Sequence, residues 1–484
     1  MMDLDRVEGL VREAGGAELW ERLTALETRT LGPSPQVELQ SPGAQDRPDF
    51  DVVIAGGGLS LLLAPALARR GLRVAILDRA TVGRAHREWN ASRPELEPLI
   101  AEEILGPDQL EELMVARYAF GVCRWFEGGS YPVRGVLDVA VEAQGLLSAA
   151  RRAAEARGVQ VWDHTTLRST AWGPGGIRMA LDAEGRSRTV TARLLVEARG
   201  AAQAGEQADL VCPTVGGVLS GLARGSDADC LDPEVGDILA TTEHVEDGRQ
   251  HVWESFPGRA GQATVYLFYY ADRGDLPDRA LSRLYARFFE TRPRFKRGEA
   301  KLVRPTFGFI PGWSRLRPAP RPPTPRVVLF GDAAARHSPL TYCGFGHLLR
   351  TLGPSADAIA ALLEGPPARL ERPIPALLDD APIHRGTGAL SRLMSRPTAD
   401  PRSLNRLLDA AFKTLHDRGE AQYRALLQDR LPIPQFMGFL SQTAAQHPAV
   451  YREVMRGLGP WATARWGGRL AWDLVRAPGA EVAA

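Results

Sequence analysis

Three consecutive glycines, Gly56, Gly57 and Gly58, separate two apolar stretches, and the second stretch ends at Asp78. Glycines let a chain turn tightly and approach a ligand closely, so a turn of this kind between a strand and a helix can hold a pyrophosphate. A carboxylate at the end of the second strand can accept hydrogen bonds from ribose hydroxyls. The spacing therefore predicts a dinucleotide-binding strand, turn, helix and strand over residues 51–79.

Two positions depart from the usual form of such a turn. Leu61 stands where a third glycine normally allows the helix to pack closely on the strand. Pro65 lies past the first turn of the expected helix, where it removes a backbone hydrogen bond and costs ~3 kcal/mol unless the helix bends. The alternative interpretation of this stretch is an ordinary buried strand–helix–strand unit without a cofactor.

A second Gly-rich turn follows an apolar strand at residues 327–330. The residues after that strand that could do chemistry are Gly331, Asp332, Pro339, Gly344 and Gly346. A carboxylate held in a tight turn can accept hydrogen bonds from a polyol, and free N–H groups at the start of the next helix can face a phosphate or a flavin carbonyl. The alternative is a capped helix after a buried strand. Two such turns in one chain favour a shared nucleotide site.

Composition sets the class of protein. The chain of 484 residues has 59 basic and 58 acidic side chains, so its charge does not indicate a nucleic-acid partner. Its four cysteines are far apart, without the spacing of a zinc site or a disulfide framework, which is typical of the reducing cytoplasm. The N-terminal stretch lacks the features of an export signal, and no uncharged apolar run reaches the ~18 residues of a spanning helix. We expect a cytoplasmic protein without a metal site.

Hydrophobic periodicity predicts the elements that carry these turns. Helices are expected over 3–29, 95–117, 138–157 and 278–291, strands over 159–162, 238–245, 251–256 and 263–270, and a hairpin over 167–193 with its turn near Glu184 and Gly185. After Gly365 the pattern is mostly helical. The expected division is an N-terminal helical extension and linker (1–48), a nucleotide-binding domain in two parts (49–206 and 311–370), an inserted sheet domain (207–310) and a helical tail (371–484).

Several strings in the sequence resemble a known family. The glycine turn with Asp78, the string LLVEARG at 194–200 and the string GDAAARHSPLTYCGFG at 331–346 are similar to the flavoproteins of the p-hydroxybenzoate hydroxylase and geranylgeranyl reductase superfamily. Within it, REWNASRPEL at 87–96 and VWESFP at 252–257 resemble lycopene cyclases of the CruA/CruP type or their paralogues. The resemblance covers roughly residues 50–370. It implies an α/β fold: a Rossmann-like FAD-binding domain with an inserted antiparallel-sheet substrate domain and a C-terminal helical region.

The resemblance also implies a cofactor and its ligands. FAD would lie with its pyrophosphate on Gly56 and Gly58, its adenosine ribose on Asp78, its ribityl chain on Asp332, and its isoalloxazine against Gly344 and Gly346. The remaining residues of the predicted cofactor set are Gly57, Arg93, Gly331 and Pro339. NAD(P)H is the candidate external reductant. Glu197 stands where the LLVEARG type of motif usually has aspartate.

Cyclising a linear carotenoid needs a proton delivered to an alkene, and a carboxylic acid kept neutral in a dry pocket can supply it. Glu254 is the candidate, because strand alternation places it on the same face as Val252 and Phe256. The alternative is a solvent-facing strand glutamate. His337 is a second candidate donor, unless it is a solvated loop histidine. The aromatic residues around Glu254 could line a polyene channel, although we expect most of them to be sheet core.

The end of the chain carries aromatic residues interleaved with arginines. From Leu431 onward these are Phe436, Phe439, Trp461, Trp466 and Trp472, with Arg452, Arg456, Arg465 and Arg469. The pattern is typical of an interfacial helix that contacts a membrane peripherally on its inner face; the alternative is packing against the FAD domain. Three functions remain open: a lycopene cyclase using reduced FAD, a monooxygenase or isoprenoid reductase, and a non-catalytic paralogue that binds flavin or carotenoid.

Overall fold

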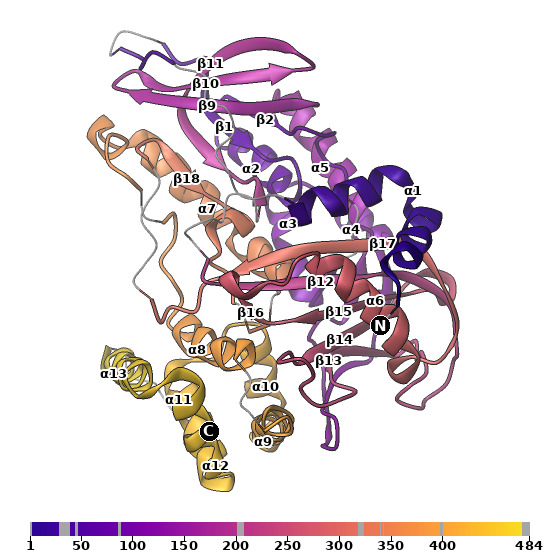
Figure 1. The fold of residues 1–484 in the computed structure, drawn as a ribbon. Helices are drawn as coiled ribbons and strands as arrows, with labels where there is room; N and C mark the ends of the chain where they lie inside the picture. Colours follow the sequence, from indigo (N-terminus) through magenta and orange to yellow (C-terminus); the bar gives the residue numbers. More distant parts are fainter. Residues whose placement is uncertain are drawn as a thin grey trace.

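The structure of the protein is a computed structural model. It describes residues 2–28, 39–43, 47–85, 89–200, 208–317, 324–338, 340–341, 343–374, 376–396 and 400–476. Arg87 and Glu88 of the REWNASRPEL string, and Pro339 of the predicted cofactor set, lie outside the described residues. The fold is mixed α/β, with two large sheets, a small third sheet and a helical C-terminal region (Figure 1).

The first sheet has parallel strands in the order β8-β2-β1-β11, and β18 pairs with the end of β11. Its strands are β1 (Phe50–Ala55), β2 (Val74–Leu77), β8 (Gln160–Trp162), β9 (Thr165–Gly173), β10 (Gly176–Ala183), β11 (Arg186–Glu197) and β18 (Val327–Leu329). Helices α2 (Leu63–Arg69), α5 (Ala143–Ala156) and α7 (Gly344–Glu364) share one core with Val52 and Ile54. Val53 and Ala55 face the residues of β9 and β10 instead. Residues 52–55 of β1 and all of β2 are apolar because both faces of these strands are buried.

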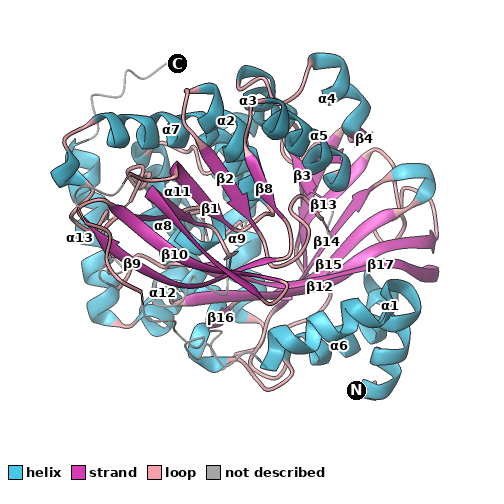
Figure 2. Cartoon of the chain, turned by 90° about the horizontal axis from the view of Figure 1, so that it is seen from above, coloured by secondary structure: helices cyan, strands magenta, loops and turns pink. Residues whose placement is uncertain are grey.

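The second sheet has the order β16-β12-β15-β14-β13-β5-β6, with β17 paired to β12. Its strands are β5 (Phe120–Arg124), β6 (Ser130–Val133), β12 (Leu210–Leu222), β13 (Val235–Ala240), β14 (His251–Pro257), β15 (Ala263–Tyr269), β16 (Ala271–Asp272) and β17 (Gly298–Gly312). Helices α1 (Leu4–Thr28) and α6 (Ala280–Phe295) cover one face, as Figure 2 shows. Residues 120–133 were expected in the first part of the nucleotide-binding domain (49–206). They belong instead to the second sheet, because β5 pairs in parallel with β13 and β6 pairs with β5.

A third, small sheet has the strand order β3-β7-β4. Its strands are β3 (Trp89–Ala91), β7 (Val139–Val141) and β4 (Met114–Arg117). It corrects two expected helices. The stretch 95–117 holds α3 (Glu97–Ala101) and α4 (Pro107–Leu113) but ends in β4, and the stretch 138–157 begins with β7 before α5 starts. Residues 139–141 form a strand because all three are buried in this sheet, and Glu142 then caps α5 by accepting a hydrogen bond from the Gly145 N–H (2.7 Å).

The C-terminal region is helical, as expected. Its helices are α8 (Ile383–Ser395), α9 (Ser403–Asp417), α10 (Glu420–Leu427), α11 (Ile433–Gln446), α12 (Ala449–Leu458) and α13 (Pro460–Arg476). Residues of these helices form one core with Val252, Phe256 and Phe268 on the face of the second sheet opposite α1 and α6. That sheet is therefore buried on both faces. None of the described helices is long and apolar enough to cross a bilayer.

Candidate functional site

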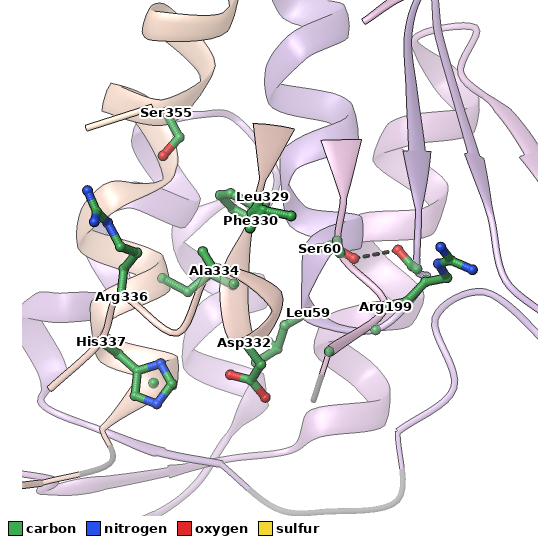
Figure 3. Close-up of a pocket in the computed structure, with 18 of the residues that line it drawn as sticks. Leu59, Ser60, Arg199, Leu329, Phe330, Asp332, Ala334, Arg336, His337 and Ser355 are labelled. Carbon is green, nitrogen blue, oxygen red and sulfur yellow. Dashed lines mark hydrogen bonds between the residues drawn. The ribbon is translucent and has the colours of Figure 1, made fainter. Parts of the chain in front are cut away.

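One large cavity, about 1120 Å³ in volume, opens at the carboxyl ends of β1, β2, β11 and β18. This is the place where parallel α/β sheets bind their ligands. The cavity brings together seven residues of the predicted cofactor set from both Gly-rich turns: Gly56, Gly57, Gly58, Asp78, Gly331, Asp332 and Gly344. Figure 3 shows His337 and Arg336 to the left, Asp332 and Leu59 in the middle, and Ser60 and Arg199 to the right.

The first turn needs glycine at two positions and leaves the third open. Gly56 has a φ of +119°, and a Cβ there would lie 2.3 Å from the Ala198 carbonyl oxygen. A Cβ on Gly57 would lie 3.0 Å from Asp78 Cβ, whereas one on Gly58 would meet no atom within 4 Å. Gly58 is therefore not required by packing, and its open side belongs to the cavity.

The Asp78 carboxylate is held by backbone donors. The Gly57 N–H donates to Oδ2 (2.8 Å) and the Ala80 N–H donates to Oδ1 (2.8 Å). Each oxygen keeps a second lone pair, so the carboxylate lies ordered on the cavity wall and can still accept hydrogen bonds from a ligand.

Leu61 and Pro65 are both accommodated locally. The helix begins as a 3₁₀ turn over Leu59–Leu62, and α2 starts only at Leu63, so Pro65 falls within the first turn of α2. A proline there removes no hydrogen bond that α2 needs. Leu61 is fully buried, and its Cδ2 lies 3.1 Å from the position of a Cβ on Gly83. Gly83 makes the room that a third glycine in the motif would otherwise provide.

The second turn positions a carboxylate against the start of α7. Gly331 has a φ of +61°, and Asp332 follows it in a short 3₁₀ turn. A Cβ on Gly344, the first residue of α7, would lie 3.8 Å from Asp332 Oδ1. The two residues share one wall of the cavity.

Two predicted cofactor ligands lie elsewhere. The Arg93 guanidinium binds Glu97 (2.6 Å) and Glu111 (3.2 Å), and it does not line the cavity. Gly346 is also not a lining residue, because its missing side chain leaves room for Glu95, whose Oε2 would lie 2.7 Å from a Cβ there. The resemblance placed Gly346 against the isoalloxazine, but here this glycine leaves room for the Glu95 side chain.

The REWNASRPEL segment ties the first sheet to the second. The Trp89 ring lines the cavity and stacks on Phe345 with a centroid distance of 5.1 Å. Asn90 Nδ2 donates to Tyr118 Oη (2.8 Å), and Tyr118 Oη donates to the Pro257 carbonyl at the end of β14 (3.1 Å). The segment thus connects the cavity with the strand that carries Glu254.

Glu254 lies on the face of β14 that is turned toward the helical region, as its alternation with Val252 and Phe256 predicts. It is part-buried, and burial raises the pKa of its carboxyl to about 8. Its carboxyl is within electrostatic reach of the thiol of Cys343, the residue before α7. The solvent-facing alternative is therefore wrong. Glu254 is not among the residues that line the large cavity.

A charged cluster occupies the cavity end near α8. His384 Nδ1 lies 3.2 Å from Asp380 Oδ1, and Arg315 Nη2 donates to the same oxygen (2.8 Å). Burial disfavours the Asp380 charge, but Arg315 and the hydrogen bond with His384 outweigh it and hold the pKa of Asp380 well below its usual range. His337 is buried here, and burial lowers the pKa of its imidazole. It is therefore not the solvated loop histidine of the alternative interpretation.

Sequence reasoning missed several lining residues. Glu18 and Arg22 of α1 reach the cavity from the N-terminal extension, and Glu18 pairs with Arg84 at 2.9 Å. Asp380, His384 and Asp429 reach it from the C-terminal region. Only the i, i+4 spacing of Asp380 and His384 was a visible signal, because the other positions depend on how distant elements pack.

No protein-family model and no curated protein matches this chain. Solved structures do share its fold. A geranylgeranyl bacteriochlorophyll reductase-like protein from Thermoplasma acidophilum aligns with a TM-score of 0.54 at 15% identity, over 84% of this chain and 98% of its own. A flavoprotein/dehydrogenase from Cytophaga hutchinsonii aligns with a TM-score of 0.55 at 13% identity, over 87% and 100%. The halogenase PltM aligns with a TM-score of 0.55 at 16% identity, over 88% and 91%.

These likenesses show that the chain has the fold of the FAD-dependent flavoprotein oxidoreductases. At such low identity they show the fold alone.

Proposed function

We propose that this protein is an FAD-dependent enzyme that acts on an apolar isoprenoid or polyene. A PltM variant in complex with FAD shares its fold, with a TM-score of 0.52 at 14% identity over 89% of this chain and 93% of the PltM chain. The cavity fits the group. Gly58 leaves space for a pyrophosphate, Asp78 presents ordered acceptors for a ribose, and Asp332 offers a carboxylate to a polyol beside Gly344. Bound there, reduced FAD would supply an electron-rich ring next to the substrate.

The reaction that we propose is proton-initiated cyclisation of a linear carotenoid end group. The observation that carries it is Glu254, an acid whose carboxyl forms no hydrogen bond or ion pair with other described residues. Because only burial raises its pKa to about 8, the carboxyl is mostly protonated at neutral pH and can act as a general acid. The side chains of Val252, Phe256 and Phe268 on this side of β14 and β15 are apolar and buried, and we propose that the alkene end of the substrate binds beside them.

We also propose that α12 and α13 rest on the surface of an anionic membrane from which the substrate is taken. Their exposed side chains include Tyr451, Met455, Trp461, Trp472 and Val475, and the two helices carry five arginines against two acids. The sequence pattern also assigned Phe436, Phe439 and Trp466 to this surface, but all three are buried in the core that the C-terminal helices share with the second sheet. An amphipathic basic surface of this kind binds anionic lipid.

The second candidate function is redox chemistry, either hydroxylation or reduction of a double bond. It is supported by the fold shared with a reductase-like protein, and by p-nitrophenol 4-monooxygenase PnpA from Pseudomonas putida, with a TM-score of 0.52 at 16% identity over 78% of this chain and 95% of the PnpA chain. NAD(P)H is then the proposed external reductant.

One experiment separates the functions. The full-length protein is purified, its flavin spectrum is recorded, and lycopene in anionic vesicles is incubated with it under reduction by dithionite or by NADPH. Cyclisation leaves the mass of lycopene unchanged and shifts its absorption, whereas hydroxylation adds oxygen and reduction adds hydrogen. Unchanged lycopene with retained flavin would indicate a non-catalytic paralogue and contradict the proposal.

A further inference from the structure

Asp429 is a buried carboxylate in the cavity that the sequence patterns did not identify. It lies in the turn between α10 and α11 and is 7% exposed. Neither carboxylate oxygen forms a hydrogen bond of normal geometry with another described residue. Buried polar groups in folded proteins are nearly always hydrogen-bonded, so an acid left this way in a cavity wall needs an explanation.

Hydrogen bonds of Asp429 and of the residue before it fix the turn that carries the Asp429 carboxylate. Its backbone has a φ of +56°, and its N–H donates to the Leu426 carbonyl (3.0 Å). The preceding residue, Gln428, donates from Nε2 to Ser92 Oγ (2.8 Å) and to the Gly135 carbonyl (2.9 Å). Ser92 belongs to the REWNASRPEL segment, which carries the resemblance to the lycopene cyclases. The same segment therefore holds the turn that contains Asp429.

The surroundings of Asp429 differ from those of Glu254. Burial raises the pKa of both carboxyls, but around Asp429 the positive charges of His384, Arg350 and Arg315 and the nearby Ser338 hydroxyl oppose that rise. For Glu254 burial is the only cause of the shift. Cationic side chains therefore favour the charged form of Asp429, whereas no such group opposes burial at Glu254, and a difference of this kind distinguishes a base from an acid. Both groups are within electrostatic reach of the Cys343 thiol.

We propose that Asp429 is the base that removes the proton ending the cyclisation. This inference rests on the function proposed above. A proton from Glu254 forms a C–H bond at the terminal alkene, the π electrons of a second alkene form the ring C–C bond, and a cation remains on the ring. Asp429 then takes a proton from a carbon next to the cation, and the electron pair of that C–H bond becomes the ring double bond. One proton enters and one leaves, and no electrons are gained or lost.

The test uses the full-length, flavin-loaded protein with lycopene in anionic vesicles, and measures both the rate and the position of the ring double bond. Asp429→Asn keeps a residue that tolerates the left-handed backbone. We expect the rate to fall by roughly 10² to 10⁴-fold and the products to shift toward other ring double-bond isomers, because the cation then loses its proton to other acceptors. Asp429→Glu is expected to restore part of the rate.

Asp409→Asn is the matched control. Asp409 is a carboxylate of the helical region that accepts a hydrogen bond from Tyr131 Oη (2.6 Å), and it lies outside the cavity lining. If Asp429→Asn fails to retain flavin, Asp429→Gly removes the carboxylate with a residue suited to the positive φ. A wild-type rate and isomer pattern in either flavin-loaded variant would overturn the assignment of Asp429 while leaving the cyclase function intact. An inactive wild-type protein would overturn both.

Discussion

Asp332 Oδ1 lies 3.8 Å from the point where a Cβ atom on Gly344 would stand, although the two residues belong to different elements. The carboxylate and the first backbone N–H groups of α7 therefore face the same part of the cavity. If a flavin ribityl chain binds there, Asp332→Ala removes a hydrogen-bond acceptor. We expect flavin affinity to fall by about 1.5–3 kcal/mol, roughly 10- to 100-fold. Fluorescence titration measures it, with the exposed Asp275→Ala as the control; equal affinities would contradict the placement.

Gly56 and Gly58 are expected to respond differently to alanine. Gly56→Ala places a Cβ 2.3 Å from the Ala198 carbonyl oxygen at a φ of +119°, so it should lower the free energy of unfolding by roughly 2 kcal/mol or more. Gly58→Ala meets no protein atom within 4 Å, so the Tm of the flavin-free protein should not change while flavin affinity falls. Thermal denaturation and flavin titration of both variants check this. A large loss of stability in Gly58→Ala would show that the turn is packed differently.

The pKa of Glu254 predicts how stability varies with pH. Because the pKa rises from 4.5 to about 8 on folding, the folded state binds more protons than the unfolded state between these values. The free energy of unfolding should therefore decrease as pH rises from about 5 to 8, at up to ~1.4 kcal/mol per pH unit from this group. Glu254→Gln should lose this dependence, as chemical denaturation across that range would show. Parallel pH curves for the two proteins would contradict a buried, protonated Glu254.

Cyclisation should follow the same titration. If protonated Glu254 is the donor, the rate should fall as the pH rises through about 8, and Glu254→Gln should be inactive while it retains flavin. The initial rate with lycopene measured between pH 6 and 9.5 gives the profile. Undiminished cyclisation by the flavin-loaded Glu254→Gln variant would remove Glu254 from the mechanism.

Membrane contact should depend on α13. Trp461 is 88% exposed and Trp472 is 57% exposed, so replacing both by serine should reduce flotation with anionic vesicles by 10-fold or more. Trp172 on β9 is 41% exposed and lies outside the C-terminal helices, which makes Trp172→Ser the matched control. Vesicles of neutral lipid should bind the wild-type protein less tightly. Equal flotation of all three proteins would contradict the proposed surface.

Local patterns determined the parts of this protein that depend on neighbouring residues. The run over residues 51–79 predicted a strand, turn, helix and strand because each step is set by apolar patterning and backbone freedom close in sequence. The same reasoning placed Glu254 on the face of its strand that carries Val252 and Phe256, and identified Gly331, Asp332 and Gly344 in a second Gly-rich turn.

Tertiary structure decided what those patterns could not express. Residues 139–141 became a strand because partners were available on both sides, and β5 joined the second sheet by pairing with β13. The Arg93 guanidinium pairs with Glu97 and Glu111, and the Glu95 side chain packs against Gly346. Asp429 lies in the cavity wall beside Gln428, which donates a hydrogen bond to Ser92, 336 residues earlier in the sequence. Each outcome depends on contacts between distant segments, whose partners no local spacing can specify.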